Sequence, residues 1–167
     1  MNEREFGILL EENQNRIYRL ALRILENQEE ARDVTQETLL AAFEHRARFR
    51  GEAKFSTYLY RITLNFALAT LKKKRRHLAL EKVERLISGS ENPAQEFHKE
   101  ERMEKVREVL SSLPERQKAV IHLRIYEDMS FSEIAAALGC RPATARTHYF
   151  FGLQNLRKEL KRHHGLP

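Results

Sequence analysis

The chain has 167 residues, enough for one ordinary domain or two small ones. Charged residues make up 32% of it and its formal net charge is +6, which favours polyanionic partners without identifying one. Its single cysteine, Cys140, excludes an internal disulfide and a cysteine-cluster metal site. Sparse Gly and Pro with abundant Ala, Leu, Glu, Arg and Lys predict an all-α protein, and the lack of a secretory pattern or a membrane-length apolar run predicts a soluble one.

The first part of the chain predicts three helices. Apolar residues recur at helical spacing over residues 6–25, and a second helix is expected at about residues 29–46. The polar segment ARFRGEAK then predicts a loop centred on Gly51. A third helix is expected to run from Phe55 into the basic cluster LKKKRRH.

Residues 79–99 differ in composition from the segments on either side. They include SGSENPAQ, which is rich in Gly, Ser, Asn and Pro and poor in apolar residues, and this predicts a linker or an exposed loop. Helical spacing returns after it, with a helix expected to begin near Pro114 and to reach Ile125. The sequence therefore predicts two small helical domains, at residues 1–78 and 100–163, joined by a flexible linker.

The C-terminal segment SFSEIAAALGCRPATARTHYFFGLQNLRKEL predicts a helix-turn-helix. A capping box at Ser130 and Glu133 opens a short helix, Gly139 suits its C-terminal cap, and Pro142 suits the first turn of a long final helix. The outer face of that final helix carries residue types that contact phosphates and base edges: Arg141, Thr144, Arg146, Thr147 and Phe150. An ordinary helical hairpin with a solvated charged face is the alternative.

The second helix begins with the acidic segment ENQEEARDVTQETLL. Spacings of three and four residues place Asp33, Gln36, Glu37 and Leu40 on one face of the helix. Such a face suits the docking of a basic helix from a partner. A solvated helix start is the alternative interpretation, because acidic side chains are favoured at helix N-termini.

The third helix carries the opposite charge. Arg61 is followed by an uninterrupted run of cations at residues 72–76, and aromatic rings are interleaved nearby. Cations beside flat rings suit single-stranded nucleic acid, because rings stack on bases while cations follow the phosphates. The alternatives are that the rings belong to the core, or that the run is a membrane-surface or nuclear-localisation signal.

Together these blocks resemble the bacterial RNA polymerase sigma factors of the extracytoplasmic-function (ECF) class, also called group IV. The similarity spans roughly residues 6–160. In the first domain it rests on EEARDVTQETLLAAF, FRGEAKFSTYLYRITLN and the basic cluster. In the second it rests on LSSLPERQKAVIHLR, SFSEIAAALG and the final helix. The order and spacing of the blocks argue against a chance likeness.

The resemblance implies a role for each predicted surface. Asp33, Gln36, Glu37 and Leu40 correspond to the face that docks on the clamp helices of the largest polymerase subunit, and the second domain to the part that binds the polymerase flap. Contacts to the melted −10 element are implied for Phe49, Lys54, Phe55, Ser56, Arg61, Asn65, Lys72, Arg75 and Arg76. Contacts to the duplex −35 element are implied for Arg141, Thr144, Arg146, Thr147 and Phe150.

Several positions depart from the family pattern. Tyr58 stands where the family usually has Trp, and Arg141 replaces a helix-capping residue. Phe151 and Gly152 replace the usual Arg-Ala pair, which removes an expected arginine contact to DNA; Gly152 is also expected to weaken its helix by up to about 1 kcal/mol. Cys140, in the turn, is expected to have a buried or half-buried structural role.

The resemblance also implies a function without catalysis. A protein of this class uses no cofactor or metal and takes no small-molecule substrate; it lends core RNA polymerase the ability to find and open a promoter. An anti-sigma protein is a further implied partner, so we expect a cytoplasmic bacterial protein that such a partner can hold at the membrane. A helix-turn-helix regulator that acts without polymerase, an enzyme acting on nucleic acid and an interaction protein unable to transcribe are the alternatives.

Overall fold

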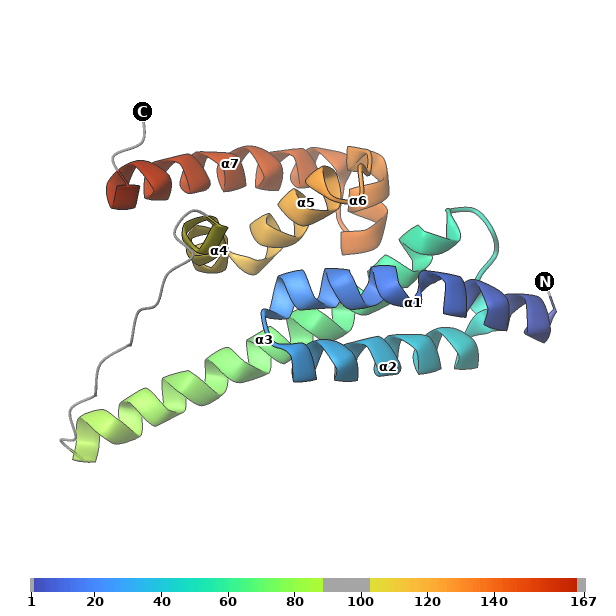
Figure 1. The fold of residues 1–167 in the computed structure, drawn as a ribbon, viewed down its shortest axis with the longest axis horizontal. Helices are drawn as coiled ribbons and strands as arrows, with labels where there is room; N and C mark the ends of the chain where they lie inside the picture. The colour runs from blue at the N-terminus through green and yellow to red at the C-terminus, as the bar shows by residue number, and fades with distance from the viewer. Residues whose placement is uncertain (1, 89–102, 165–167) are drawn as a thin grey trace.

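A computed structural model describes the fold of residues 2–88 and 103–164, and the side chains of residues 2–79 and 108–162. The chain is all-α over the described residues, as the sequence predicts, and it forms two lobes (Figure 1). The N-terminal lobe contains α1 (Glu3–Leu25), α2 (Gln28–Glu44), the 3-10 turn η1 (Arg46–Arg48) and α3 (Phe55–Ser88). The C-terminal lobe contains α4 (Met103–Ser112), α5 (Glu115–Ile125), α6 (Phe131–Leu138) and α7 (Pro142–His164).

Local side-chain bonds set the ends of the short helices where the sequence predicts them. The capping box that opens α6 is present, with the Glu133 amide donating to Ser130 Oγ and the Ser130 amide donating to Glu133 Oε2. Gly139 closes α6 in the left-handed conformation at φ 62°. A second capping box, at Asn2 and Glu5, opens α1. The predicted helix-turn-helix of α6 and α7 is therefore confirmed as a fold.

Helix α3 extends further than the sequence predicts. The basic cluster at residues 72–76 lies inside the helix, which continues to Ser88. The residues after the cluster, HLALEKVERLIS, are mostly good helix formers without Gly or Pro, so nothing stops the helix before Ser88. The rest of the predicted linker, residues 89–99, lies outside the described residues.

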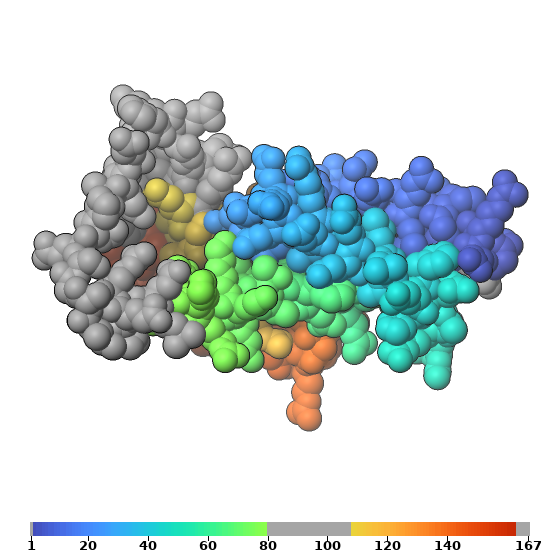
Figure 2. All heavy atoms as spheres, turned by 90° about the horizontal axis from the view of Figure 1, so that it is seen from below, coloured from blue at the N-terminus to red at the C-terminus, as the bar shows by residue number. Residues whose placement is uncertain are grey.

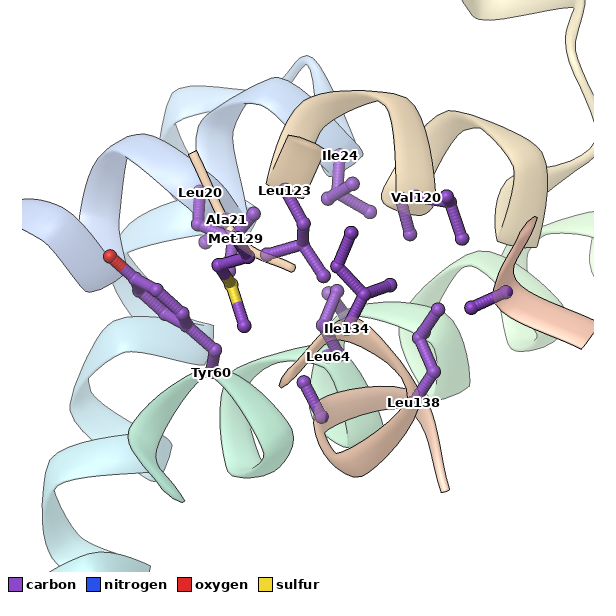
Figure 3. Close-up of a cluster of buried hydrophobic side chains, with 14 of the residues drawn as sticks. Leu20, Ala21, Ile24, Tyr60, Leu64, Val120, Leu123, Met129, Ile134 and Leu138 are labelled. Carbon is purple, nitrogen blue, oxygen red and sulfur yellow. The ribbon is translucent and has the colours of Figure 1, made fainter. Parts of the chain in front are cut away.

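One apolar core joins the two lobes. We call it the interlobe core; the N-terminal lobe contributes Leu20, Ala21, Ile24, Leu25, Ala31, Val34, Tyr60, Leu64 and Ala67, and the C-terminal lobe contributes Ala119, Val120, Leu123, Met129, Ile134, Ala135, Ala137, Leu138 and Ala145. Figure 3 shows Leu123, Met129 and Ile134 pointing towards Leu64 and Ile24. Ile134 and Leu123 are fully buried, so α5 and α6 complete their burial against the other lobe.

Gly152 allows a close approach of two helices in the C-terminal lobe. A Cβ atom at this position would lie 2.8 Å from Ile121 Cδ1 and 3.3 Å from Gln117 Cβ, both on α5. The departure from the usual Ala therefore has a packing reason: α7 comes nearer to α5 than a side chain at this position would allow. This contact offsets the helix-propensity cost that the sequence predicts for Gly152.

A half-buried hydrogen bond and an ion pair also connect the lobes. The Tyr60 hydroxyl on α3 donates to Glu127 Oε2, in the loop between α5 and α6, and Arg23 Nη1 lies 3.4 Å from Glu127 Oε1. The Arg23 guanidinium also lies over the Tyr126 ring, 4.0 Å from its centre. Burial raises the pKa of Tyr60, and the bond to the Glu127 carboxylate raises it further, so the hydroxyl keeps its proton and acts as the donor.

A second ion pair between the lobes lies next to a buried histidine. Lys118 Nζ on α5 lies 2.5 Å from Glu26 Oε1, and Glu26 adopts the left-handed conformation at the C-terminal end of α1. His122 lies one turn further along α5, is 4% exposed, and neither ring nitrogen has a hydrogen-bond partner. Burial lowers the pKa of His122 to about 4, and the nearby charges of Lys118 and Arg23 add to this effect. The folded protein therefore holds a neutral imidazole.

Removing the Tyr60 hydroxyl is expected to weaken the contact between the lobes. Tyr60→Phe leaves the half-buried Glu127 carboxylate with one partner fewer, so we expect the free energy of unfolding to fall by about 2 kcal/mol. Urea unfolding followed by circular dichroism measures this loss. Tyr18→Phe, on a half-buried ring packed against the same core, is the matched control, with an expected change below about 0.5 kcal/mol. Equal effects of the two substitutions would contradict the assignment.

The buried His122 is expected to make stability depend on pH. His122 takes up a proton near pH 6.5 in the unfolded chain and only near pH 4 in the folded chain. Its contribution to the free energy of unfolding is therefore fully present above pH 6.5. The free energy of unfolding should fall by roughly 3 kcal/mol as the pH is lowered from 6.5 to 4.

His122→Leu should remove this dependence of the free energy of unfolding on pH. It should also raise stability at neutral pH, because it removes two unpaired ring nitrogens. Urea unfolding at a series of pH values measures both effects, with exposed His45→Leu as the control. A slope in His122→Leu as steep as that of the wild type would refute the assignment.

Candidate nucleic-acid interface

The predicted polymerase-docking residues lie on one exposed face of α2. Asp33, Gln36 and Glu37 are exposed, and Leu40 is 60% exposed although it is a large apolar residue. The same helix buries Ala31, Val34 and Ala42 on its other side. Helix α2 is therefore amphipathic, and its exposed face is the one that the sequence predicts. This face is acidic and ends in the apolar side chain of Leu40.

The loop between α2 and α3 encloses a small cavity. Its volume is about 180 Å³, and it is lined by residues 48–53, Thr57, Tyr58 and Arg61, together with Ala136 of α6. Two of the predicted −10 residues, Phe49 and Arg61, line it. Burial raises the pKa of Tyr58, so its hydroxyl is neutral at this wall.

The other predicted −10 residues of this region lie elsewhere. Lys54 and Asn65 are exposed and Ser56 is half-buried, and none of them lines the cavity. The Phe55 ring packs edge-on against Phe6 at 5.1 Å and against Phe49 at 5.2 Å. This ring therefore supports the N-terminal lobe, in line with the alternative that the rings belong to the core.

The cations of α3 form a separate exposed row. Lys72, Arg75 and Arg76 line a cleft of about 490 Å³ together with Glu115 and Arg116 at the start of α5. Lys74 lies outside that cleft and pairs with Glu30 of α2, with Nζ 3.1 Å from Oε1. Three predicted −10 cations therefore share one cleft, and one carboxylate from the other lobe reaches into it.

The predicted −35 residues lie on the outer face of α7, apart from Arg141, which directly precedes this helix. Arg141, Thr144, Arg146, Thr147 and Phe150 are all exposed, and Ala145 between them is buried against the rest of the C-terminal lobe. Arg146 lies over the Phe131 ring, with its Cζ atom 5.5 Å from the ring centre. Phe150 is 58% exposed and contacts Phe151, which is 48% exposed. The face thus combines cations, hydroxyls and unburied rings.

Two ion pairs between the lobes involve predicted DNA-binding cations. Lys54 Nζ lies 2.7 Å from Glu133 Oε1 of α6, and Arg75 pairs with Glu115 of α5. The bond from Lys54 and the bonds from Ser130 lower the pKa of Glu133 to about 2, so this carboxylate is ionised throughout the neutral range. Figure 2 shows the C-terminal lobe, in orange, lying directly against α3, in green.

The sequence interpretation missed the residues that join the lobes. Tyr60, Arg23 and Glu127 carry no motif, and each is of a type that is usually solvated or part of a single-domain core. Their only sequence signal was Tyr60 within the aromatic series of α3. Pairing them requires knowledge of where the second lobe sits, which the sequence pattern does not contain.

The described part of the chain also bears on metal binding and on membrane insertion. Among the described side chains of residues 2–79 and 108–162, three or more His, Cys, Asp or Glu residues nowhere gather as a metal site would require. Over the same part of the chain, none of the helices has the length and apolar character needed to cross a membrane.

Two known family models match the chain, one in each lobe. Residues 9–77 match Sigma-70 region 2, and residues 103–156 match Sigma-70, region 4. The first match covers most of α1, all of α2 and the part of α3 that ends at the basic cluster. The second covers α4 to α6 and most of α7, including the helix-turn-helix.

Curated relatives are similar over most of this chain. The ECF RNA polymerase sigma factor SigE of Mycolicibacterium smegmatis is 32% identical, over 93% of this chain and 61% of its own length. The chain thus spans less than two thirds of that relative. The ECF RNA polymerase sigma-E factor of Haemophilus influenzae is 30% identical, over 89% of this chain and 84% of its own. The RNA polymerase sigma-H factor of Pseudomonas aeruginosa is 28% identical, over 96% of this chain and 88% of its own length.

Two solved structures share the fold at lower identity. The sigma factor RpoE of Bartonella quintana, solved in complex with the anti-sigma factor NepR, matches with a TM-score of 0.73 and 19% identity over 94% of this chain and 97% of its own. CnrH, solved with the cytosolic domain of CnrY, matches with a TM-score of 0.70 and 24% identity over 97% of this chain and 91% of its own. With the two family models in the same order and relatives at 30% identity or more along most of the chain, this protein belongs to the ECF RNA polymerase sigma factors.

Proposed function

We propose that this protein binds core RNA polymerase and directs it to promoters by recognising the −35 element as duplex and the −10 element as melted strand. The observation that carries the proposal is the family match of both lobes, in the order region 2 then region 4. The protein itself breaks and forms no covalent bonds in this role. Its contribution is to supply contacts that polymerase lacks.

The outer face of α7 supports duplex recognition. The second helix of a helix-turn-helix enters the major groove with its N-terminal residues at the base edges. In α7 these residues include Thr144, Arg146 and Thr147, and all three are exposed. An arginine that bonds to guanine contributes about 1–3 kcal/mol to discrimination between bases. Arg146 is the residue that we expect to contribute most to −35 specificity.

The surface of α3 and the loop before it supports strand recognition. Lys72 and Arg76 are exposed and suit phosphates, while the cavity beside Arg61 suits a single flat group about the size of a nucleobase. A base taken out of the stack costs a few kcal/mol, and contacts of this kind offset that cost. In this assignment Phe49 and Tyr58 are the cavity rings, and Phe55 acts by holding Phe49 in place.

The partners follow from the surfaces and from the relatives. We assign the α2 face of Asp33, Gln36, Glu37 and Leu40 to the clamp helices of the largest polymerase subunit, because an acidic face with one exposed leucine suits a basic amphipathic partner. The C-terminal lobe is assigned to the polymerase flap. The two related structures were solved with an anti-sigma factor and a cytosolic protein domain, which supports an anti-sigma partner here. These assignments place the protein in the bacterial cytoplasm, and an anti-sigma partner with a membrane anchor would hold it at the membrane.

Transcription with purified components tests the proposal. Wild-type protein should direct core polymerase to new start sites in run-off assays. Lys72→Ala with Arg76→Ala should lower open-complex yield at least tenfold while holoenzyme assembly changes less than twofold, because two lost phosphate contacts act on DNA alone. These two cations are chosen because neither belongs to the Arg75–Glu115 pair.

The matched control removes two exposed cations from α1, with Arg4→Ala and Arg16→Ala. It changes the net charge equally and should leave both measurements near the wild-type values. A comparable loss of assembly and open complex in the α3 variant would reject the strand assignment. Failure of the wild-type protein to associate with core polymerase would reject the proposed function as a whole.

A further inference from the structure

Helix α6 lies on the surface that the proposed function assigns to the −10 strand. Ala136, in the middle of α6, forms one wall of the cavity beside Arg61. Glu133, one turn earlier, holds Lys54 by an ion pair of 2.7 Å. The first helix of the helix-turn-helix thus contacts both the cavity and one of the cations.

A second helix of the same lobe reaches the cation row of α3. Glu115, in the first turn of α5, pairs with Arg75 and lines the cleft that Lys72 and Arg76 share. Carboxylates and phosphates bond to the same donors of lysine and arginine, with similar charge-assisted geometry. Glu115 and Glu133 therefore occupy, on this surface, the positions that suit two phosphates of a bound strand.

The two ion pairs are supported by buried packing. Ile134 and Ala135 of α6 belong to the interlobe core, and the Glu127 loop that precedes α6 is tied to Tyr60 and Arg23. Helix α6 cannot move aside as a flexible side chain would, because displacing it exposes part of that core. A strand that takes the cavity and the cations must displace the lobe.

From these contacts we infer that the packed C-terminal lobe is an intramolecular competitor of single-stranded DNA, with Glu133 and Glu115 taking the place of phosphates on the predicted −10 surface. This inference rests on the proposed function for the identity of the strand. The reading face of α7 is exposed in the same arrangement, so duplex binding at Arg146 and Thr147 is not blocked. Packing of the lobes therefore opposes one of the two DNA contacts and leaves the other accessible.

Charge removal at Glu133 tests the competition directly. In Glu133→Gln the amide oxygen still accepts the Ser130 amide hydrogen, so the capping box persists while the charge facing Lys54 is lost. The probe is a short fluorescein-labelled single-stranded DNA of mixed sequence, titrated with full-length protein in the absence of polymerase and followed by anisotropy. We expect the affinity to rise about two- to fivefold, the range that one exposed ion pair provides.

Glu5→Gln is the matched control for this measurement. Glu5 occupies the same capping-box position at the start of α1, so the substitution changes the net charge and the cap chemistry equally, away from the contact between the lobes. An affinity gain as large in Glu5→Gln as in Glu133→Gln would overturn the inference. Unchanged affinity in Glu133→Gln, including a failure of both proteins to bind the probe, would overturn it too.

Zero-length crosslinking of the wild-type protein gives an independent measurement. A carbodiimide joins a lysine amine to an adjacent carboxylate as an amide, with loss of water, so the Lys54–Glu133 and Lys118–Glu26 pairs report on the packed lobes. Lys118 is buried and lies outside the predicted strand surface. Adding the single-stranded DNA should lower both crosslink yields, as read by mass spectrometry. Loss of the Lys54–Glu133 crosslink alone, or of neither, would show that the strand and the packed lobe coexist and would refute the inference.

The run-off assay keeps this inference separate from the proposed function. Both tests above use the free chain, whereas run-off transcription requires polymerase and the whole promoter. Competition without run-off transcription would reject the proposed function alone. Run-off transcription without competition would reject this inference alone.

Discussion

The interlobe core is the constraint on which the other features of this structure depend. Ile134 and Leu123, which a helix-turn-helix must bury, complete their burial against Ile24 and Leu64 of the other lobe. Neither lobe covers all of its own apolar surface, and small helical units of this size have little core to spare. The packing of the lobes is therefore part of the stability of each of them, and any partner that separates the lobes must cover the surface that it exposes.

Polar side chains make that packing specific. Apolar surfaces alone allow many relative orientations, but Tyr60 and Arg23 must both reach Glu127, and Lys118 must reach Glu26. These half-buried groups would lose their partners if the lobes slid or rotated. Glu26 and Asp128 are the described non-glycine residues with positive φ, and both lie at these contacts. The left-handed backbone conformation, which is unfavourable for a non-glycine residue, thus occurs in loops that contact the other lobe.

The charge distribution separates the two DNA-binding surfaces. Lys54 and Arg75 pair with carboxylates of α6 and α5, whereas Arg141 and Arg146 at the start of α7 are exposed. The same C-terminal lobe thus places Glu115 and Glu133 against cations of the N-terminal lobe and leaves the cations of α7 exposed. This polarity lets one small lobe pack on a basic surface and still offer a basic surface to duplex DNA. It also means that the net charge of +6 understates how basic α3 and α7 are.

The sequence by itself determined the local elements and the residue types on their outer faces. Capping boxes, Gly139 and helical spacing act over a few residues, which is why the short helices, the helix-turn-helix and the exposed faces of α2 and α7 were predictable. The family likeness came from the same local blocks. The predicted −10 residues were dispersed more than expected, because Phe55 faces the core while Lys54 faces the other lobe.

Only the tertiary structure decided how the lobes meet. The close approach at Gly152 and the contacts of Tyr60, His122 and Glu133 all depend on pairs of residues far apart in the chain. A periodic pattern tells which face of a helix is apolar, but it does not tell which other face covers it. Burial and charge pairing between distant helices settle that choice, and they are properties of the packed molecule.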